Sequence, residues 1–175
     1  MKRVLLSLAA ITLGSAALQA QVTKSTVPGI TNFARVETTV ACAGAITPAS
    51  VAGIKNMGFA SIINLRMASE EGADIDAEAA AAKAAGIKFI HLPLNSAAPD
   101  PAVADQFLKV ISQPGTEPAF IHCHSGNRAA AMWLIKRVLV DKWDTDRAVE
   151  ESAQLGLTNP GLKKFALDYI AAHKN

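Results

Sequence analysis

The amino-acid sequence predicts a single α/β domain in which helices flank a mainly parallel central sheet. Short apolar runs, each long enough for one buried strand, occupy residues 60–65, 87–92 and 118–122. Segments with helical signals separate these runs, and this alternation is typical of parallel sheets covered by helices. The length of 175 residues and the hydrophobic content of 50% suffice for one sizeable core.

The N-terminus is expected to be a cleavable signal peptide that covers residues 1–20. A short basic start precedes an apolar run at residues 4–18, and Ala20 supplies a small residue before the predicted cleavage site. The protein is therefore expected to be periplasmic or secreted, without stable membrane insertion after cleavage. Residues 21–34 are polar and are expected to be a flexible segment, which leaves residues 35–173 for the folded domain.

The first elements of the domain are expected to be a β-rich strand at residues 36–42 and a helix that starts at Thr47. Pro48 at the first helical position indicates that helix, and Gly58 ends it. The remaining expected elements are, in order, the strand at 60–65, an alanine-rich helix at 73–85 closed by Gly86, the strand at 87–92, a helix from Asp100 to Ser112, the strand at 118–122, and three helices that begin at Arg128, Asp144 and Asn159.

The charge balance argues against a nucleic-acid-binding function. The chain has 17 Lys and Arg against 15 Asp and Glu. Cleavage after residue 20 removes Lys2 and Arg3 and no acidic residue, so that 17 − 2 = 15 basic residues face 15 acidic ones. A neutral mature chain lacks the concentrated basic patch that nucleic-acid binding requires.

The segment at residues 121–128, Ile-His-Cys-His-Ser-Gly-Asn-Arg, carries the clearest chemical signal. It places Cys123 at the end of an apolar strand, followed by a short polar loop and by Arg128 at the start of a helix. Loop N–H groups and a helix N-terminus favour a bound anion, and the same field stabilises a thiolate. The planar guanidinium of Arg128 can hold two oxygens of a tetrahedral oxyanion. The pattern therefore predicts an anion-binding site with Cys123 as nucleophile.

The upstream sequence extends this signal to a family resemblance. Residues 58–66 read Gly-Phe-Ala-Ser-Ile-Ile-Asn-Leu-Arg, the acidic pair Glu70-Glu71 follows, and residues 84–87 and 91–94 read Ala-Ala-Gly-Ile and His-Leu-Pro-Leu. Together with the Cys123 segment, this order resembles the beta-lactamase-hydrolase-like phosphatase family over residues 35–140. That family is a bacterial branch related to dual-specificity protein phosphatases.

The resemblance implies a phosphatase-like fold and hydrolysis of phosphate monoesters, of the tyrosine or dual-specificity type, through a phosphocysteine. Cys123 is then the nucleophile, Arg128 binds the phosphoryl oxygens, and His122 supports the thiolate. The cradle around the phosphoryl group is built from His124, Ser125, Gly126 and Asn127. The implied partner is a phosphorylated protein or a small phosphate ester. No cofactor is implied, and a single loop histidine without a second ligand at metal spacing makes a metal site improbable.

Other positions depart from the superfamily pattern or leave a role open. Four residues separate Cys123 from Arg128, as in this bacterial branch, where the wider superfamily has five. Ala129 replaces the usual Ser or Thr, which predicts slow breakdown of the phosphocysteine. Asp100 is the first candidate for the general acid, and its alternative role is to cap the following helix. Weaker candidates for the acid are Glu70, Glu71 and Asp105. Arg66 is expected either to reach the anion or to form a surface ion pair.

Two other functions fit the same residues. A rhodanese-like sulfurtransferase would carry a persulfide on Cys123, since its loop can read Cys-x-Ser-Gly-Asn-Arg; the Gly-Gly-x-x-x-Trp-like segment that usually follows in rhodaneses is missing. A binding domain for oxyanions or phosphoproteins, with weak or no catalysis, would be consistent with Ala129. Cys42 is expected either to be a small apolar strand residue or to be a resolving thiol for Cys123.

Overall fold

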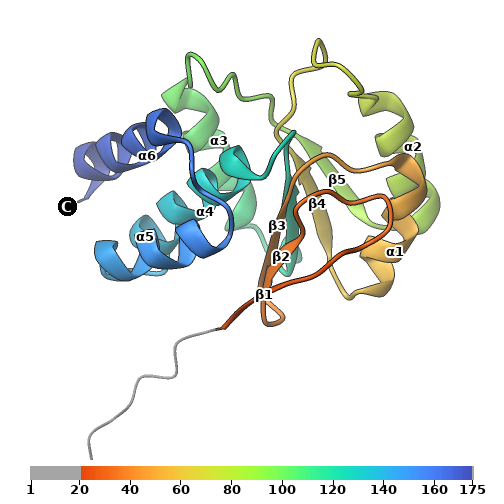
Figure 1. Ribbon diagram of the computed structural model, residues 1–175, viewed down its shortest axis with the longest axis horizontal. Helices are drawn as coiled ribbons and strands as arrows, with labels where there is room; N and C mark the ends of the chain where they lie inside the picture. Colours follow the sequence, from red (N-terminus) through yellow and green to blue (C-terminus); the bar gives the residue numbers. More distant parts are fainter. Residues whose placement is uncertain (1–20, 175) are drawn as a thin grey trace, which may run out of the picture.

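A six-stranded sheet divides the molecule into two helical layers in the computed structural model, which describes residues 21–174 (Figure 1). The expected signal peptide lies outside the described residues. The strands are β1 (Val22–Lys24), β2 (Ala34–Val36), β3 (Val40–Ala43), β4 (Ser61–Asn64), β5 (Lys88–His91) and β6 (Ala119–His122). Their order is β1-β2-β3-β6-β4-β5, with β3, β6, β4 and β5 parallel and the β1-β2-β3 edge antiparallel. The predicted α/β class with a mainly parallel sheet is confirmed.

Two helices cover one face of the sheet and four cover the other. The helices are α1 (Val51–Asn56), preceded by a 3-10 turn η1 (Pro48–Ser50), α2 (Ile75–Ala85), α3 (Pro101–Ile111), α4 (Asn127–Leu139), α5 (Thr145–Gln154) and α6 (Pro160–His173). Figure 1 shows α1 and α2 on one side and α3 to α6 on the other. Local chemistry sets the helix ends as predicted: Gly86 closes α2 at φ 65°, and the Asp144 and Asn159 side chains accept hydrogen bonds from the first turns of α5 and α6.

The expected single strand at residues 36–42 is wrong, because the chain reverses within it. Val36 ends β2 and Val40 begins β3, and the two strands pair antiparallel with Val36 opposite Val40. Glu37 adopts φ 42°, a left-handed conformation that helps to form the tight turn. The β-rich composition predicted extended backbone correctly but gave no signal for the reversal, since no glycine or proline marks it.

The segment at residues 21–34, expected to be flexible, takes part in the fold. Val22–Lys24 forms β1 and pairs with β2 along the edge of the sheet. Further along, Ile30 and Phe33 are buried, and the Phe33 ring stacks on Phe120 of β6 with 6.2 Å between the ring centroids. Two apolar side chains within a polar stretch therefore help to anchor it, together with the pairing of β1, because both reach the core.

Helix α4 lies at the centre of the larger helical layer and fixes the position of the loop before it. Almost the whole helix is buried, and it packs against both α5 and α6. In the buried contact with α5 the Trp133 indole N–H donates to Glu151, whose carboxylate also accepts from Arg137. Among the described residues, no helix is both long enough and apolar enough to cross a membrane.

Replacement of Phe33 by alanine tests whether the N-terminal segment contributes to stability. We expect Phe33→Ala to lower the free energy of unfolding by about 3 kcal/mol, since a buried ring would leave a cavity against Phe120. Urea denaturation of residues 21–175 measures it. A change below about 0.5 kcal/mol, which is typical of surface substitutions, would show that the segment is only loosely attached.

Candidate active site

The loop between β6 and α4 lies where the central parallel strands end. Cys123 follows β6 directly, and Asn127 is the first residue of α4. Ligands of open α/β sheets bind beyond the carboxyl ends of the strands, so this position suits a site. The Cys123 side chain is only 1% exposed and lies at the base of the loop. Its sulfur accepts a hydrogen bond from the Gly126 N–H at 3.1 Å.

The carbonyl groups of this loop are held on its outer side. The His124 carbonyl accepts from the Ala45 N–H at 2.9 Å, and the Ser125 carbonyl accepts from the Asn32 side-chain amide at 3.1 Å. In a planar trans peptide, the carbonyl of one residue points opposite to the N–H of the next. The N–H groups of Ser125 and Gly126 are therefore turned inward. The bond from Gly126 to the Cys123 sulfur agrees with this arrangement.

Two glycines make this loop conformation accessible. Gly126 has φ 99°, a region that residues with a side chain rarely adopt. Gly44, just after β3, lies under the loop, and a Cβ there would be 2.8 Å from the His124 carbonyl oxygen. The loop can therefore approach β3 closely only because position 44 has no side chain.

Arg128 is held in place by acceptors on three different segments. Its Nη1 donates to the Leu65 and Leu94 carbonyls, each at 2.9 Å. Its Nη1 and Nη2 also form a bidentate pair with Glu70, at 2.5 and 2.8 Å. Burial lowers the pKa of this guanidinium, but the bonds to Glu70 and the neighbouring Cys123 thiolate outweigh burial and raise its pKa. A fixed cation thus lies beside the sulfur of Cys123, with which the Arg128 side chain interacts.

Glu70 is a partner of Arg128 and is unsuited to be the general acid. Burial raises the pKa of its carboxyl, but hydrogen bonds from Arg128 and from the Met67 N–H outweigh burial and lower the pKa to about 2. The group is therefore a carboxylate at neutral pH and has no proton to donate. This result removes one of the weaker candidates named from the sequence.

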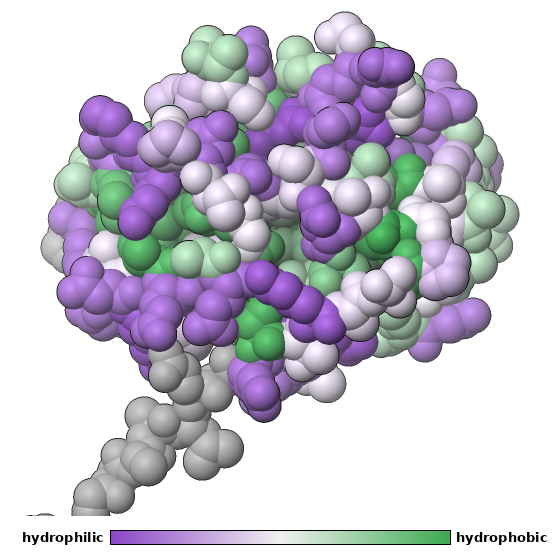
Figure 2. All heavy atoms as spheres, viewed as in Figure 1, coloured by the Kyte–Doolittle hydropathy of each residue, from purple (hydrophilic) through white to green (hydrophobic). Residues whose placement is uncertain are grey.

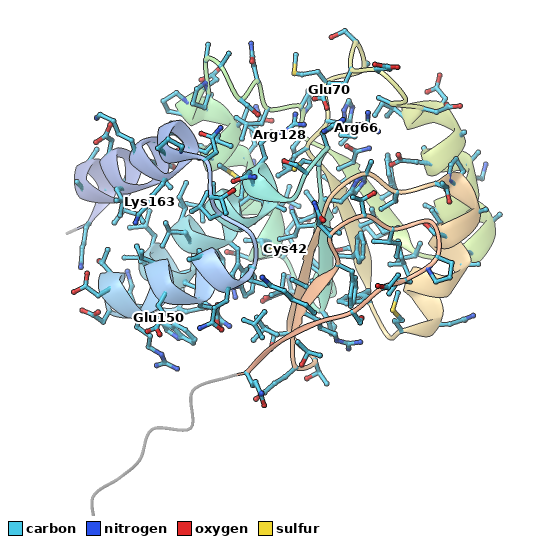
Figure 3. The ribbon with its side chains drawn as sticks, viewed as in Figure 1. Cys42, Arg66, Glu70, Arg128, Glu150 and Lys163 are labelled. Atoms are coloured by element: carbon cyan, nitrogen blue, oxygen red, sulfur yellow. The ribbon has the colours of Figure 1, made fainter. Side chains whose placement is uncertain are left out.

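Arg66 supports the site from behind, and it forms an ion pair, one of its two expected roles, but with its own side chain buried rather than at the surface. The side chain is 1% exposed, and its guanidinium donates to the Glu71 and Gly72 carbonyls at 2.5 and 2.8 Å. A longer contact of 3.4 Å joins it to Glu70. Figure 3 shows Arg66, Glu70 and Arg128 at the same end of the sheet. Arg66 therefore holds the turn that carries Glu70, since the hydrogen bonds of its guanidinium go to that turn.

A cleft of about 550 Å³ opens over Arg128 and His124. Its other walls come from the turn after β4 and from the loop after β5, with lining residues Met67, Ser69, Glu70, Glu71, Asn95, Ser96 and Ala97. Asp100 is outside this lining set. Its carboxylate accepts from the Ala102 N–H at 2.9 Å and so caps α3, the alternative role foreseen from the sequence. Asp105, a weaker candidate for the acid, accepts a hydrogen bond from the Tyr169 hydroxyl.

A second groove of about 710 Å³ lies on the other side of the loop. Ser125 and Asn127 form one wall, and the N-terminal segment and the turn between α5 and α6 form the others. The Asn127 side-chain oxygen accepts from the Thr158 and Asn159 N–H groups, both at 2.7 Å, and so ties that turn to the loop. Figure 2 shows apolar and weakly polar residues along the middle of the viewed face, bordered by hydrophilic ones.

The two cysteines are both free and buried. Cys42 pairs in register with Ile121, two residues before Cys123, on the adjacent parallel strand. Strand spacing and rise then place the Cα atoms of Cys42 and Cys123 about 8 Å apart, beyond the separation of about 7 Å that a disulfide tolerates. Burial raises the pKa of the Cys42 thiol, and the charge of Cys123 raises it further. These features favour the apolar strand role for Cys42.

Several residues that shape the site had no signal in a single sequence. Asn32, Gly44 and Thr158 contact the loop from segments far away in the chain. Glu70 was visible as part of an acidic pair, but its pairing with Arg128 was not. A buried arginine requires an acidic partner, and that rule alone could have pointed to Glu70. Within residues 21–174, no three His, Cys, Asp or Glu side chains gather in a way that could hold a metal ion.

Comparison with known proteins places this site in context. Residues 32–140 match the family described as beta-lactamase hydrolase-like protein, phosphatase-like domain. No curated protein matches the chain significantly. Among solved structures, a putative phosphatase (DUF442) from Shewanella putrefaciens CN-32 is similar, with 17% identity, a TM-score of 0.70, and coverage of 84% of this chain and 96% of that one.

Two further structures share the fold. P. aeruginosa TpbA in complex with pTyr is 21% identical, with a TM-score of 0.66 and coverage of 90% of this chain and 93% of that one. The core catalytic domain of the PP-IP phosphatase SIW14 from S. cerevisiae is 18% identical, with a TM-score of 0.64 and coverage of 83% and 88%. These likenesses confirm the predicted phosphatase-like fold.

The pair of Glu70 with Arg128 predicts a specific dependence of stability on pH. The pKa of Glu70 falls from 4.5 to about 2 on folding, so its contribution is complete above pH 4.5 and is lost as the pH falls toward 2. We expect Glu70→Gln to be less stable than the parent by on the order of 1–3 kcal/mol at pH 7. The difference in the free energy of unfolding between parent and variant should disappear as the pH falls from 4.5 toward 2. Urea denaturation at several pH values measures this difference, and a constant difference would contradict the assignment.

Proposed function

Because this chain belongs to the beta-lactamase hydrolase-like protein, phosphatase-like domain family, we propose that it is a cysteine-dependent phosphatase that hydrolyses phosphate monoesters. The observation that carries the proposal is the loop at residues 123–128, in which Cys123, inward N–H groups and the fixed cation of Arg128 converge. We also propose that it works after export, which the composition of residues 1–20 supports.

In the first step, the Cys123 thiolate attacks phosphorus and the bond to the ester oxygen breaks. Two features support the developing charge on the equatorial oxygens: the inward N–H groups of the loop and the guanidinium of Arg128. Both are already in place because the loop carbonyls and Glu70 hold them. The leaving oxygen takes a proton from a general acid. The product of this step is a phosphocysteine on Cys123.

In the second step, water attacks the phosphocysteine, inorganic phosphate leaves, and the thiolate returns. The residue after Arg128 is Ala129, which is fully buried and has no hydroxyl to stabilise the departing thiolate. We therefore expect the second step to be slow relative to the first. The intermediate should accumulate during turnover.

We propose Asp100 as the general acid that protonates the leaving oxygen. It is exposed and stands at the end of the loop whose residues Asn95 to Ala97 line the cleft. Its bond to the Ala102 N–H uses one carboxylate oxygen, so the other remains able to carry a proton. Glu70 is excluded by its pairing with Arg128. Glu71, exposed at the cleft, is the alternative to compare.

The charges of the cleft favour a substrate with one phosphate group. Among the described residues that line the cleft, Glu70 and Glu71 are carboxylates, while Arg128 is the single permanent cation and is already paired with Glu70. A polyphosphate would bring several negative charges to a site that offers them no further cation. The pTyr complex of the similar protein TpbA supports an aryl phosphate as the substrate class.

The sulfurtransferase is the second candidate, because the short Cys-x4-Arg spacing suits a persulfide as well as a phosphoryl group. Both reactions would use the Cys123 thiolate and the same N–H groups. The family match and the fold favour the phosphatase. A domain that binds oxyanions without catalysis is the third, and tungstate would then raise the melting temperature while no substrate is hydrolysed.

Steady-state hydrolysis by reduced residues 21–175 tests the proposal. We expect turnover of para-nitrophenyl phosphate and of a phosphotyrosine peptide, and little turnover of an inositol pyrophosphate. Cys123→Ser should abolish the activity, and Arg128→Lys should lower it by about 100-fold, since lysine lacks the planar fork. The buried Cys42→Ser serves as the control for loss of a thiol. Hydrolysis that survives Cys123→Ser would contradict the mechanism.

The dependence on leaving group tests the acid. Phenyl phosphate requires protonation of its leaving oxygen much more than para-nitrophenyl phosphate does. We therefore expect Asp100→Asn to slow formation of the phosphocysteine by about 100-fold with phenyl phosphate and only by a few-fold with para-nitrophenyl phosphate. Single-turnover rates measure this step directly. If Glu71→Gln shows that selectivity and Asp100→Asn does not, the acid is Glu71.

A further inference from the structure

A buried carboxylate lies behind the site and has no part in the chemistry proposed above. Glu78, in the first turn of α2, is 1% exposed, whereas the next acidic residue before it on the same helix, Asp76, is exposed. A buried carboxylate is costly unless polar partners surround it, so its contacts require an explanation. Both partners that it meets stand at the ends of strands that lead into the site.

The first partner is His122, the last residue of β6. Its Nε2 lies 3.2 Å from Oε2 of Glu78, and both side chains are buried. The two ring nitrogens of His122 have no aligned hydrogen bond within the described part of the chain, so the ring is held by this close contact with Glu78 and by packing against Phe120. His122 immediately precedes Cys123. Its orientation therefore affects the strand end from which the sulfur projects.

The second partner is Asn64, the last residue of β4. Its side-chain N–H donates to the same Oε2 of Glu78 at 2.7 Å, and its side-chain oxygen accepts from the Arg66 N–H at 2.7 Å. Arg66 in turn holds the turn that carries Glu70, the partner of Arg128. Asn64 and His122 stand opposite each other in the register of β4 and β6. One oxygen atom thus meets two neighbouring strand ends.

We propose that Glu78 is a positioning residue that couples the two halves of the active site. Through His122 it fixes the strand end that carries Cys123. Through Asn64 it fixes the turn that holds Arg128 by way of Glu70. The position of Oε2, rather than the charge of the carboxylate, is the property that matters, because only an oxygen at that point reaches both partners. This proposal rests on the proposed function, because the residues that Glu78 positions are those of the proposed active site. The effect of Glu78 on Cys123 and its effect on Arg128 can nevertheless each be measured without catalysis.

Two conservative substitutions separate position from charge. Glu78→Gln keeps an oxygen at the same reach and removes the charge, whereas Glu78→Asp keeps the charge and withdraws the oxygen by one methylene group. The Cys123 link is read from the rate of its alkylation by iodoacetate, quantified by mass spectrometry of the Cys123 peptide. The Arg128 link is read from the dissociation constant of tungstate, measured by calorimetry. Asp76→Asn, an exposed change on the same helix, is the matched control.

We expect Glu78→Asp to slow alkylation and to weaken tungstate binding, each by about tenfold, a coupling typical of residues in contact. Glu78→Gln should stay within about threefold of the parent in both measurements. The opposite pattern, with Gln impaired and Asp normal, would overturn the account in favour of a role for the charge. Variants that lower only the melting temperature would overturn it in favour of a merely structural residue. If the parent protein hydrolyses no phosphate ester, alkylation of Cys123 and binding of tungstate still test the role of Glu78. Failure of the proposed phosphatase activity can therefore be distinguished from failure of the proposed positioning role.

Discussion

The site depends on one constraint, which is that the carbonyl groups of the loop after β6 are bonded on its outer side. The Ala45 N–H and the Asn32 side chain hold two successive carbonyls there. Planar peptides then turn the following N–H groups inward, and the bond from Gly126 to the Cys123 sulfur is one result. Asn32 comes from the N-terminal segment and Ala45 from the residues just after β3. The sheet edge formed by β1, β2 and β3 therefore helps to create the anion cradle as well as the core.

The second half of the site is a fixed cation. Arg128 is bound by two backbone carbonyls and by Glu70, so its charge is in place before any substrate arrives. Preorganised charge of this kind lowers a barrier without the cost of reorganisation during the reaction. The pairing of Arg128 with Glu70 also offsets much of the positive charge of the cleft. Among the described residues that line the cleft there are one preorganised cation and two carboxylates, and for this reason we propose a substrate with a single phosphate group rather than a polyanion.

The sequence predicted those parts of the molecule that local signals determine. Apolar runs located β4, β5 and β6, and the caps Gly86, Asp144 and Asn159 located helix ends. The position of Cys123 between strand and helix followed from the same signals. Contacts between distant segments could not be predicted. The attachment of residues 22–34 depends on the contact of Phe33 with Phe120. Arg66 was expected to be able to reach the anion, because the sequence does not show that the turn at Glu71 and Gly72 folds back onto its guanidinium.

The most direct test of the account is to trap the intermediate on Cys123. Residues 21–175 would be mixed with para-nitrophenyl phosphate, quenched in acid within the first turnovers, and digested for mass spectrometry. We expect the peptide containing Cys123 to carry one phosphoryl group in a large fraction of molecules, because Ala129 leaves the second step slow. A Cys123 peptide that is never phosphorylated, but gains one sulfur atom after exposure to thiosulfate, would contradict the phosphatase and establish the sulfurtransferase.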